Sequence, residues 1–191
     1  PDASTGKHVV LVGLGAIGSH TLELLARTMM VSRLTLIDRD VYEAHNLPHQ
    51  AIQPADIGQS KAAVQAGRAR QIRPGLEVDA IHADVADVPI GRLRGDVLLT
   101  GLDSKLARQV VNERVWRLGI PWVDAGVLAM DLLARVNVYR PGDNQPCLEC
   151  AWGEMEYRTL EVKRPCQAGG GTRTDAPGFL GSLAAALQAA E

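Results

Sequence analysis

Short apolar runs alternate along the chain with longer stretches that carry apolar residues at helical spacing. The run at residues 9–12 is Val-Val-Leu-Val, and those at 34–37 and 97–100 are almost as apolar, which is typical of strands buried on both faces of a sheet. Further strands are predicted at 76–82 and 121–127, a short polar crossover at 84–93, and helices at 19–30, 62–72 and 105–118. Strands that alternate with helices predict an α/β fold with a Rossmann-like, doubly wound and mostly parallel sheet.

The pattern changes after about Asp131. Residues 132–139 alternate as in an antiparallel strand, residues 141–144 form a Pro-Gly-Asp-Asn turn, and residues 180–191 are predicted to be helical. Because the first strand starts close to the beginning and the helix continues to the last residue, we expect one domain over 1–191, trimmed from a longer chain at one or both ends. Residues 130–191 carry a Cys-x-x-Cys pair and a third cysteine.

Composition and charge narrow the function. The chain has 191 residues, 46% hydrophobic and 22% charged, and a formal net charge of −2. This charge gives no basic field for nucleic acid or an anionic membrane, and no apolar run approaches the roughly 18 residues of a membrane span. We therefore expect a cytoplasmic protein whose partner is a small molecule or another protein.

A glycine motif follows the first predicted strand. Gly13 allows a tight turn, Gly15 lets backbone amides approach a phosphate, and Gly18 lets the next helix pack closely on the strand. The start of that helix directs amides and the positive end of its dipole at the phosphate. Asp38, about 20 residues further on, follows the second strand and is placed to accept hydrogen bonds from a ribose. The motif predicts an adenine nucleotide without saying which one.

A set of further motifs occurs in a defined order along the chain. They are Asp38-x-Asp40, Asn46-Leu47 with Gln50, Lys61 in a Gly-x-x-Lys-Ala context, Asp103 with Arg108 and Asn112, and Pro146-Cys147-x-x-Cys150. Each is weak alone, but together they resemble the ThiF/MoeB/ubiquitin-activating (E1-like) superfamily. That family adenylates the C-terminal glycine of ubiquitin-like and sulfur-carrier proteins. The resemblance covers nearly the whole chain, from about Lys7 to Glu191.

The resemblance implies a set of roles for an ATP- and Mg²⁺-dependent site. Asp38 would bind the ribose hydroxyls, Asn46 and Lys61 would contact the phosphates, and Asp103 would hold Mg²⁺ with Asp40 nearby. His49 and Gln50 belong to the same nucleotide-binding loop. The resemblance also implies a homodimer whose partner is the C-terminus of a ubiquitin-like protein, a sulfur-carrier protein or a peptide. The alternative role for Asp103 is that of a helix N-cap.

One departure from the family pattern concerns His49, which stands where relatives usually have arginine. Arginine carries a permanent charge and a bidentate fork, whereas histidine is only partly charged at neutral pH. The family's second phosphate arginine comes from an N-terminal helix of the partner subunit, and this sequence has no such helix. This departure leaves open the hypothesis of a non-catalytic scaffold subunit. A third hypothesis, an NAD-dependent oxidoreductase, is supported only by the glycine motif and Asp38.

The cysteines provide the last candidate chemistry. By resemblance, Cys147 and Cys150 are the first half of a four-cysteine Zn²⁺ site whose second pair lies beyond Glu191; the alternative is a reduced thiol pair. Cys166 stands where relatives place a loop cysteine that can form a covalent link to the carrier. We therefore name Lys61, Asp103 and Cys166 as candidate catalytic residues, with an inert thiol as the alternative for Cys166.

Overall fold

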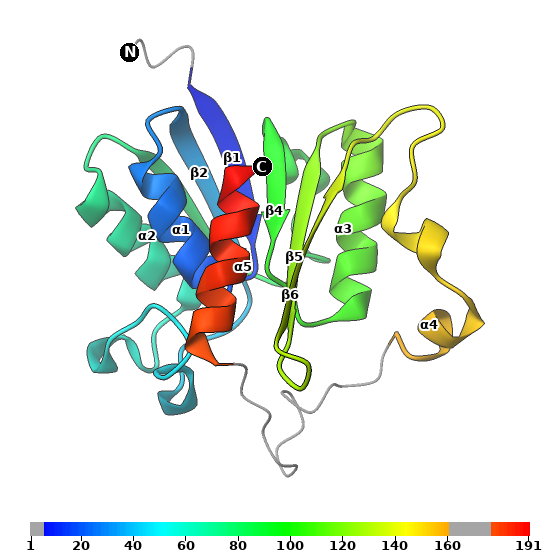
Figure 1. The fold of residues 1–191 in the computed structure, drawn as a ribbon. Coiled ribbons are helices and arrows are strands. Elements are labelled where there is room, and N and C mark those ends of the chain that lie inside the picture. Colours follow the sequence, from blue (N-terminus) through cyan, green and yellow to red (C-terminus); the bar gives the residue numbers. More distant parts are fainter. Residues whose placement is uncertain (1–5, 161–176) are drawn as a thin grey trace.

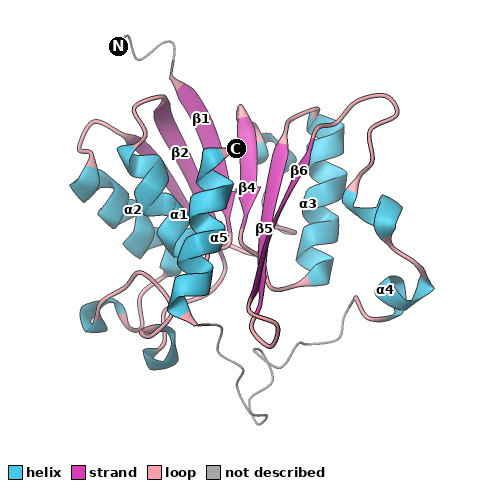
Figure 2. Cartoon of the chain, in the orientation of Figure 1, coloured by secondary structure: helices cyan, strands magenta, loops and turns pink. Residues whose placement is uncertain are grey.

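The chain folds around a six-stranded sheet in the order β3-β2-β1-β4-β5-β6. The computed structural model describes residues 6–160 and 177–191 (Figures 1 and 2). The strands are β1 Lys7–Val12, β2 Val31–Asp38, β3 Glu77–His82, β4 Val97–Thr100, β5 Trp122–Leu128 and β6 Leu133–Tyr139. The first five run parallel, and β6 pairs antiparallel with β5. The predicted α/β fold with a mostly parallel sheet and an antiparallel C-terminal strand is confirmed.

Five α-helices are present in the described part of the chain. They are α1 Gly18–Arg27, α2 Lys61–Ile72, α3 Lys105–Leu118, α4 Glu154–Arg158 and α5 Gly178–Ala190. Single 3₁₀ turns lie at η2 Ala44–Asn46, η3 Pro54–Asp56, η4 Ile90–Leu93 and η5 Leu148–Ala151. In Figure 1, α1 and α5 lie side by side across one face of the sheet.

Alternate residues of β1 divide the core into two halves, because successive side chains of a strand point to opposite faces. Val9 and Leu11 pack with buried residues of α1 and α2. Val10 and Val12 pack with Val111 of α3 and with buried residues of the crossover between β3 and β4. The helices therefore cover both faces of the sheet, which is why β1 is apolar throughout.

The structure corrects several predicted boundaries. Helix α1 ends at Arg27 instead of residue 30, because Thr28 is extended and Met29 and Met30, each 69% exposed, have no core to pack against. Helix α2 begins at Lys61, one residue before the predicted start at 62. Its N-cap is Ser60, whose side chain makes no capping hydrogen bond, while Asp56 belongs to the separate turn η3.

Candidate functional site

The carboxyl ends of three neighbouring strands, β2, β1 and β4, lie side by side. The Gly13 amide donates to Ile37 O at the end of β2 (2.9 Å), and the Gly101 amide donates to Val12 O at the end of β1 (3.0 Å). Strands β2 and β3 lie on one side of β1, and β4 and β5 lie on the other side. The carboxyl end of β1, next to β4, is therefore the topological switch point, where ligands bind in open α/β sheets. We call the residues gathered here, Gly13, Gly15, Gly18, Asp38 and Lys61, the carboxyl-edge site.

The three glycines of the motif differ in what surrounds them. Gly13 has φ +86°, a conformation that favours glycine, and a Cβ there would lie 2.7 Å from Gly101 O. A Cβ on Gly18 would lie 1.8 Å from Gly13 O, so Gly18 is required by the close approach of α1 to the turn. A Cβ on Gly15 would meet only Gln50 Nε2, at 4.0 Å. Gly13 and Gly18 are therefore required for the backbone of the turn to pack, whereas Gly15 leaves space in front of the turn.

The Asp38 carboxylate holds the turn and the following loop. Its Oδ2 accepts from the Leu14 amide (2.6 Å) and its Oδ1 accepts from the Asp40 amide (2.8 Å). Burial raises the pKa of Asp38, against the opposing effects of the Lys61 charge and these two amides. Each carboxylate oxygen has a second lone pair, so a ribose hydroxyl can still donate to it.

Lys61 is the buried cation of the site. It begins α2 and is 7% exposed, and its Nζ lies 3.3 Å from Asp40 Oδ2, with the Tyr42 ring centroid 5.7 Å away. Its amide donates to Asp40 O, which ties the start of α2 to the end of β2. The fold therefore brings Lys61 to Asp38 and Asp40 across more than 20 residues of sequence.

Asn46, His49 and Gln50 lie on the loop between β2 and α2. Asn46 Oδ1 accepts from the Glu43 amide (2.9 Å), and Asn46 O accepts from the amides of His49 and Gln50. The Asn46 side chain therefore stabilises its own 3₁₀ turn, and its Nδ2 group is the donor that a phosphate contact requires. The loop also contacts the C-terminal helix, because a Cβ on Gly178 would lie 2.9 Å from Pro48 O.

Asp103 follows β4 at the same edge and is exposed. It does not form the helix N-cap considered as an alternative: the N-cap of α3 is Ser104, whose Oγ accepts from the Ala107 amide (3.3 Å). Its charge acts on Arg39, a cation between the two aspartates of the Asp38-x-Asp40 motif. A hydrogen bond to Asp84 (2.6 Å) and the charges of Asp84, Asp40 and Asp103 raise the pKa of Arg39. Asp103 therefore belongs to the electrostatic surroundings of Asp40.

Arg108 and Asn112, quoted with Asp103 in the sequence motif, lie elsewhere. Arg108 Nε lies 3.0 Å from both oxygens of Asp124, a fully buried carboxylate that also accepts from Thr100 Oγ1 (2.6 Å). The Arg108–Asp124 pair thus links α3 to β5 beneath the carboxyl edge. Because a buried carboxylate is costly without a partner, this pair contributes to the fold.

The cysteine segment, Cys147–Tyr157, packs on α3. Cys147 Sγ and Cys150 Sγ are 3.3 Å apart, and Glu149 between them accepts from Gln109, Asn112 and Tyr157. Burial raises the pKa of the Cys147 thiol, but hydrogen bonds from Cys150, Asn112 and nearby amides outweigh it and lower that pKa. Residues 6–160 and 177–191 bring together no group of three or more metal-ligating side chains. Cys166 lies outside the described residues.

A family model described as "ThiF family" matches residues 4–190. The chain belongs to the ThiF family. The curated relatives include ubiquitin-like modifier-activating enzyme 5 of Bombyx mori, 28% identical over 180 residues, which span 85% of this chain and 45% of that protein. The enzyme of the same name from Branchiostoma floridae is 29% identical, over 84% of this chain and 44% of that protein. This ThiF chain thus spans about half the length of the curated relatives it matches.

Solved structures of Escherichia coli MccB share the fold. MccB with ATP is 24% identical and superimposes with a TM-score of 0.75, over 99% of this chain and 55% of that one. MccB with AMPCPP and the peptide MccA is 25% identical, with the same TM-score and coverage. The described part of this ThiF chain contains no helix that is long and apolar enough to cross a membrane.

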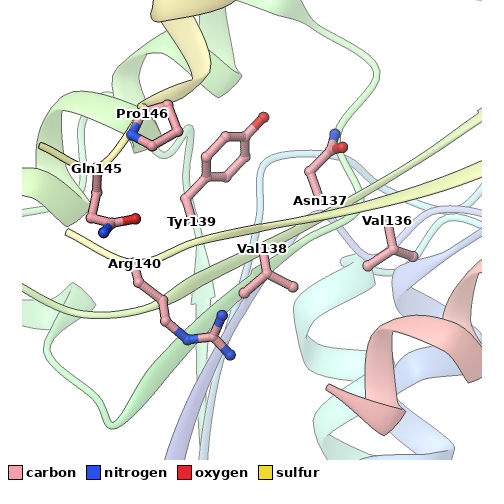
Figure 3. Close-up of a pocket in the computed structure, with 7 residues that line it drawn as sticks. All are labelled: Val136, Asn137, Val138, Tyr139, Arg140, Gln145 and Pro146. Carbon is pink, nitrogen blue, oxygen red and sulfur yellow. The ribbon is translucent and has the colours of Figure 1, made fainter.

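Two surface hollows are present, and neither is lined by any of the five residues of the carboxyl-edge site. One, of about 360 Å³, follows the outer part of β6 (Figure 3) and is lined by Val136, Asn137, Val138, Tyr139, Arg140, Gln145 and Pro146. The other, of about 670 Å³, lies between α1, α2 and the 50–53 loop and includes Gln50 and Arg68. Arg68 donates to Ala51 O and lies 3.4 Å from Glu23 of α1, so it anchors this loop to both helices.

Sequence reasoning missed Tyr42 and Gln65, which are both fully buried. Tyr42 OH donates to Leu14 O within the glycine turn (3.0 Å), and Gln65 Nε2 donates to Tyr42 OH (2.7 Å). Burial raises the pKa of Tyr42 far above its ordinary value, so the hydroxyl stays protonated at neutral pH. The available signal was an aromatic residue inside a polar loop, in a chain with only 4% aromatic residues.

Proposed function

We propose that this ThiF chain uses ATP to adenylate the C-terminal carboxylate of a ubiquitin-like protein, a sulfur-carrier protein or a peptide, with release of pyrophosphate. The observation that supports this proposal is the convergence of Gly15, Asp38 and Lys61 at the switch point of the sheet. These residues offer open space beside backbone amides, an acceptor for hydroxyl groups and a buried cation.

The reaction requires an oxygen of the substrate carboxylate to attack the α-phosphorus of ATP. A new P–O bond forms, the bond to the bridging oxygen breaks, and the electron pair leaves with pyrophosphate. Attacker and phosphate both carry negative charge, so the site must hold them in line and neutralise phosphate oxygens. In this proposal the amides of the glycine turn, Lys61 Nζ and Asn46 Nδ2 donate to phosphate oxygens, while Asp38 orients the ribose.

The residues present fit ATP and magnesium at this edge. A Cβ would fill the space in front of Gly15, and Lys61 is held by Asp40, whose side chain is 56% exposed and free to exchange its partner for a phosphate or a metal ion. Asp103 is an exposed carboxylate on the neighbouring strand end, and oxygen ligands of this kind suit Mg²⁺. When bound, Mg²⁺ would neutralise phosphate charge. Asp103 and Asp40 are the residues that would hold it.

The names of the related proteins support the class of partner. Relatives are named as enzymes that activate ubiquitin-like modifiers, and MccB structures contain the peptide MccA. We extend both to this chain as the class of substrate, a protein or peptide with a free C-terminus. We also propose a homodimer, a covalent carrier link at Cys166, and a Zn²⁺ ion held by Cys147, Cys150 and ligands outside the described residues.

A scaffold function is the second candidate, and His49 is the residue that favours it. A histidine supplies less positive charge to the phosphates at neutral pH than the arginine expected by resemblance. A ThiF fold with that change could bind nucleotide and pair with an active subunit without catalysing adenylation itself.

ATP–pyrophosphate exchange, measured with a panel of ubiquitin-like proteins and peptides, tests the proposal. The binding of ATP and of NAD to the protein is measured in parallel with the exchange assay. We expect ATP with Mg²⁺ to bind and exchange to depend on one carrier. Stabilisation by NAD at similar concentrations, equal to that by ATP, would favour the oxidoreductase. ATP binding without exchange for any carrier would favour the scaffold.

A further inference from the structure

The peptide group between Leu14 and Gly15 is held by a side chain from the loop after β2. Tyr42 is fully buried, and its hydroxyl donates to Leu14 O (3.0 Å). The preceding amide, Leu14 N–H, donates to Asp38 Oδ2 (2.6 Å). Leu14 is therefore anchored on both sides, its amide by the β2 strand end and its carbonyl by Tyr42.

The position of the Leu14 carbonyl sets the direction of the next amide. The described peptide bonds contain no cis bond, and in a planar trans peptide C=O and N–H point in opposite directions. With Leu14 O directed at the buried Tyr42 hydroxyl, Gly15 N–H points away from it. A Cβ on Gly15 would meet only Gln50 Nε2, at 4.0 Å, so the turn faces open space at Gly15.

Gln65 extends this link to the nucleotide-binding loop. Its Nε2 donates to Tyr42 OH (2.7 Å) and also lies 3.3 Å from Ala51 O, the residue that follows Gln50. The Ala51 amide donates to Ser19 Oγ of α1 (3.0 Å). One chain of hydrogen bonds thus joins the glycine turn, α2 and the loop that carries Asn46, His49 and Gln50.

A purely packing role would need the aromatic ring alone. Phenylalanine would fill the same volume without placing a hydroxyl in the core, where a hydroxyl without a hydrogen-bond partner is destabilising. The hydroxyl of Tyr42 is instead used twice, as donor to Leu14 O and as acceptor from Gln65.

We propose that Tyr42 is a positioning residue for nucleotide phosphates, because it fixes the Leu14–Gly15 peptide with Gly15 N–H directed at a phosphate oxygen, with Gln65 supporting Tyr42. This inference rests on the proposed function. The Tyr42 hydroxyl sets the orientation of the phosphate-binding turn. Tyr42 itself does not touch the nucleotide in this proposal.

The test compares the affinities of adenosine, AMP and ATP with Mg²⁺ for the wild-type chain, Tyr42→Phe and the control Tyr157→Phe. The control also removes a hydrogen-bonded hydroxyl, but from the cysteine segment, where it donates to Glu149 (3.1 Å). We expect Tyr42→Phe to weaken AMP and ATP binding about fivefold to tenfold, the equivalent of one hydrogen bond, and to change adenosine binding less than twofold. Tyr157→Phe should leave all three within twofold.

A loss that is equal for adenosine and ATP would overturn the proposal, because it would show general damage to the site and no effect on the phosphates. Unchanged binding by a folded Tyr42→Phe would overturn it as well. Gln65→Leu keeps the Tyr42–Leu14 contact and provides a second variant should Tyr42→Phe fail to fold. It should give a smaller loss with the same preference for phosphate-bearing ligands, and no such preference would count against the proposal.

The outcome for the wild-type chain separates this inference from the proposed function. A wild-type chain that binds ATP no more tightly than adenosine has no phosphate site, and both proposals fall. A wild-type chain with carrier-dependent exchange and phosphate-dependent binding, both retained by Tyr42→Phe, contradicts only the role of Tyr42.

Discussion

The carboxyl-edge site and the cysteine segment both carry a motif that is visible in the sequence, but they are built in opposite ways. The first collects residues from the turn after β1, the start of α1, the end of β2 and the start of α2, and Asp38 and Lys61 within it are 9% and 7% exposed. The second places Cys147 and Cys150 together through one turn of 3₁₀ helix, and Cys150 is exposed.

This difference affects what each arrangement says about function. Any fold that forms the turn at η5 brings Cys147 and Cys150 together, so their 3.3 Å separation says little about a ligand. Lys61 reaches Asp38 only if β2, the following loop and α2 all take their places. Proximity across a fold is therefore stronger support for a binding site than proximity within one turn.

The largest expected effect is the loss of catalysis at the carboxyl edge with no loss of folding. Asp103→Ala should lower ATP–pyrophosphate exchange by about 100-fold or more, because a carboxylate that holds a phosphate-bound cation acts in the transition state. Its melting temperature should match the wild-type value, since Asp103 is exposed and Ser104 caps α3. Asp143→Ala, an exposed aspartate in the turn after β6, is the control. Retained exchange in Asp103→Ala would contradict the assigned role.

The glycine turn itself should separate fold from binding. Gly18→Ala should cost about 3 kcal/mol of unfolding free energy in urea, because its Cβ would lie 1.8 Å from Gly13 O. Gly15→Ala has room for a Cβ and should change stability by less than about 1 kcal/mol, yet weaken ATP binding. Equal stability losses for the two variants would show that Gly15 is also a packing residue.

Asn112→Ala should disturb the cysteine segment alone. Asn112 is 5% exposed, its Nδ2 donates to Glu149 Oε1 (2.9 Å), and its Oδ1 accepts from the Leu148 amide (3.2 Å). We expect a loss of about 1–2 kcal/mol of stability and an unchanged ATP affinity, measured by urea unfolding and calorimetry. Gln109→Ala removes only one bond to the same Glu149 and should cost less. A weaker ATP affinity would show that the two regions are coupled.

The smallest expected effect is a pH dependence at the carboxyl edge. Burial raises the pKa of Asp84, but the Ala86 amide (2.9 Å) and Arg39 (2.6 Å) outweigh it and lower that pKa. A depressed carboxyl pKa stabilises the folded state above the unfolded pKa of about 3.9, and this stability is lost as pH falls through the folded pKa. Asp84→Asn should therefore cost roughly 0.5–1 kcal/mol at pH 7, and this cost should shrink as the pH falls through the folded pKa.

Unfolding at pH 7 and at pH 2 measures this difference, with Asp87→Asn, an exposed neighbour, as the control. A cost for Asp84→Asn that is the same at pH 7 and pH 2 would place the effect in packing and not in charge.

Much of the fold was predictable because apolar periodicity records which faces are buried. The apolar run of β4 and the helical spacing of α3 gave boundaries that the structure reproduces, Val97–Thr100 and Lys105–Leu118. The end of α1 was predicted too late, because Met29 and Met30 are apolar but have no partner in the core. Hydrophobic character alone cannot tell a buried residue from an exposed one.

The sequence by itself determined the class of fold, the family and the position of the glycine turn, since these depend on local pattern and on spacing along the chain. Only the tertiary structure decided that Arg108 pairs with Asp124 instead of joining Asp103, and that Asn112 supports the cysteine segment. It also decided that Tyr42 and Gln65 hold the turn. These contacts join residues 16 to 37 positions apart, and a hydrogen bond between such distant groups exists only after the strands and helices have packed.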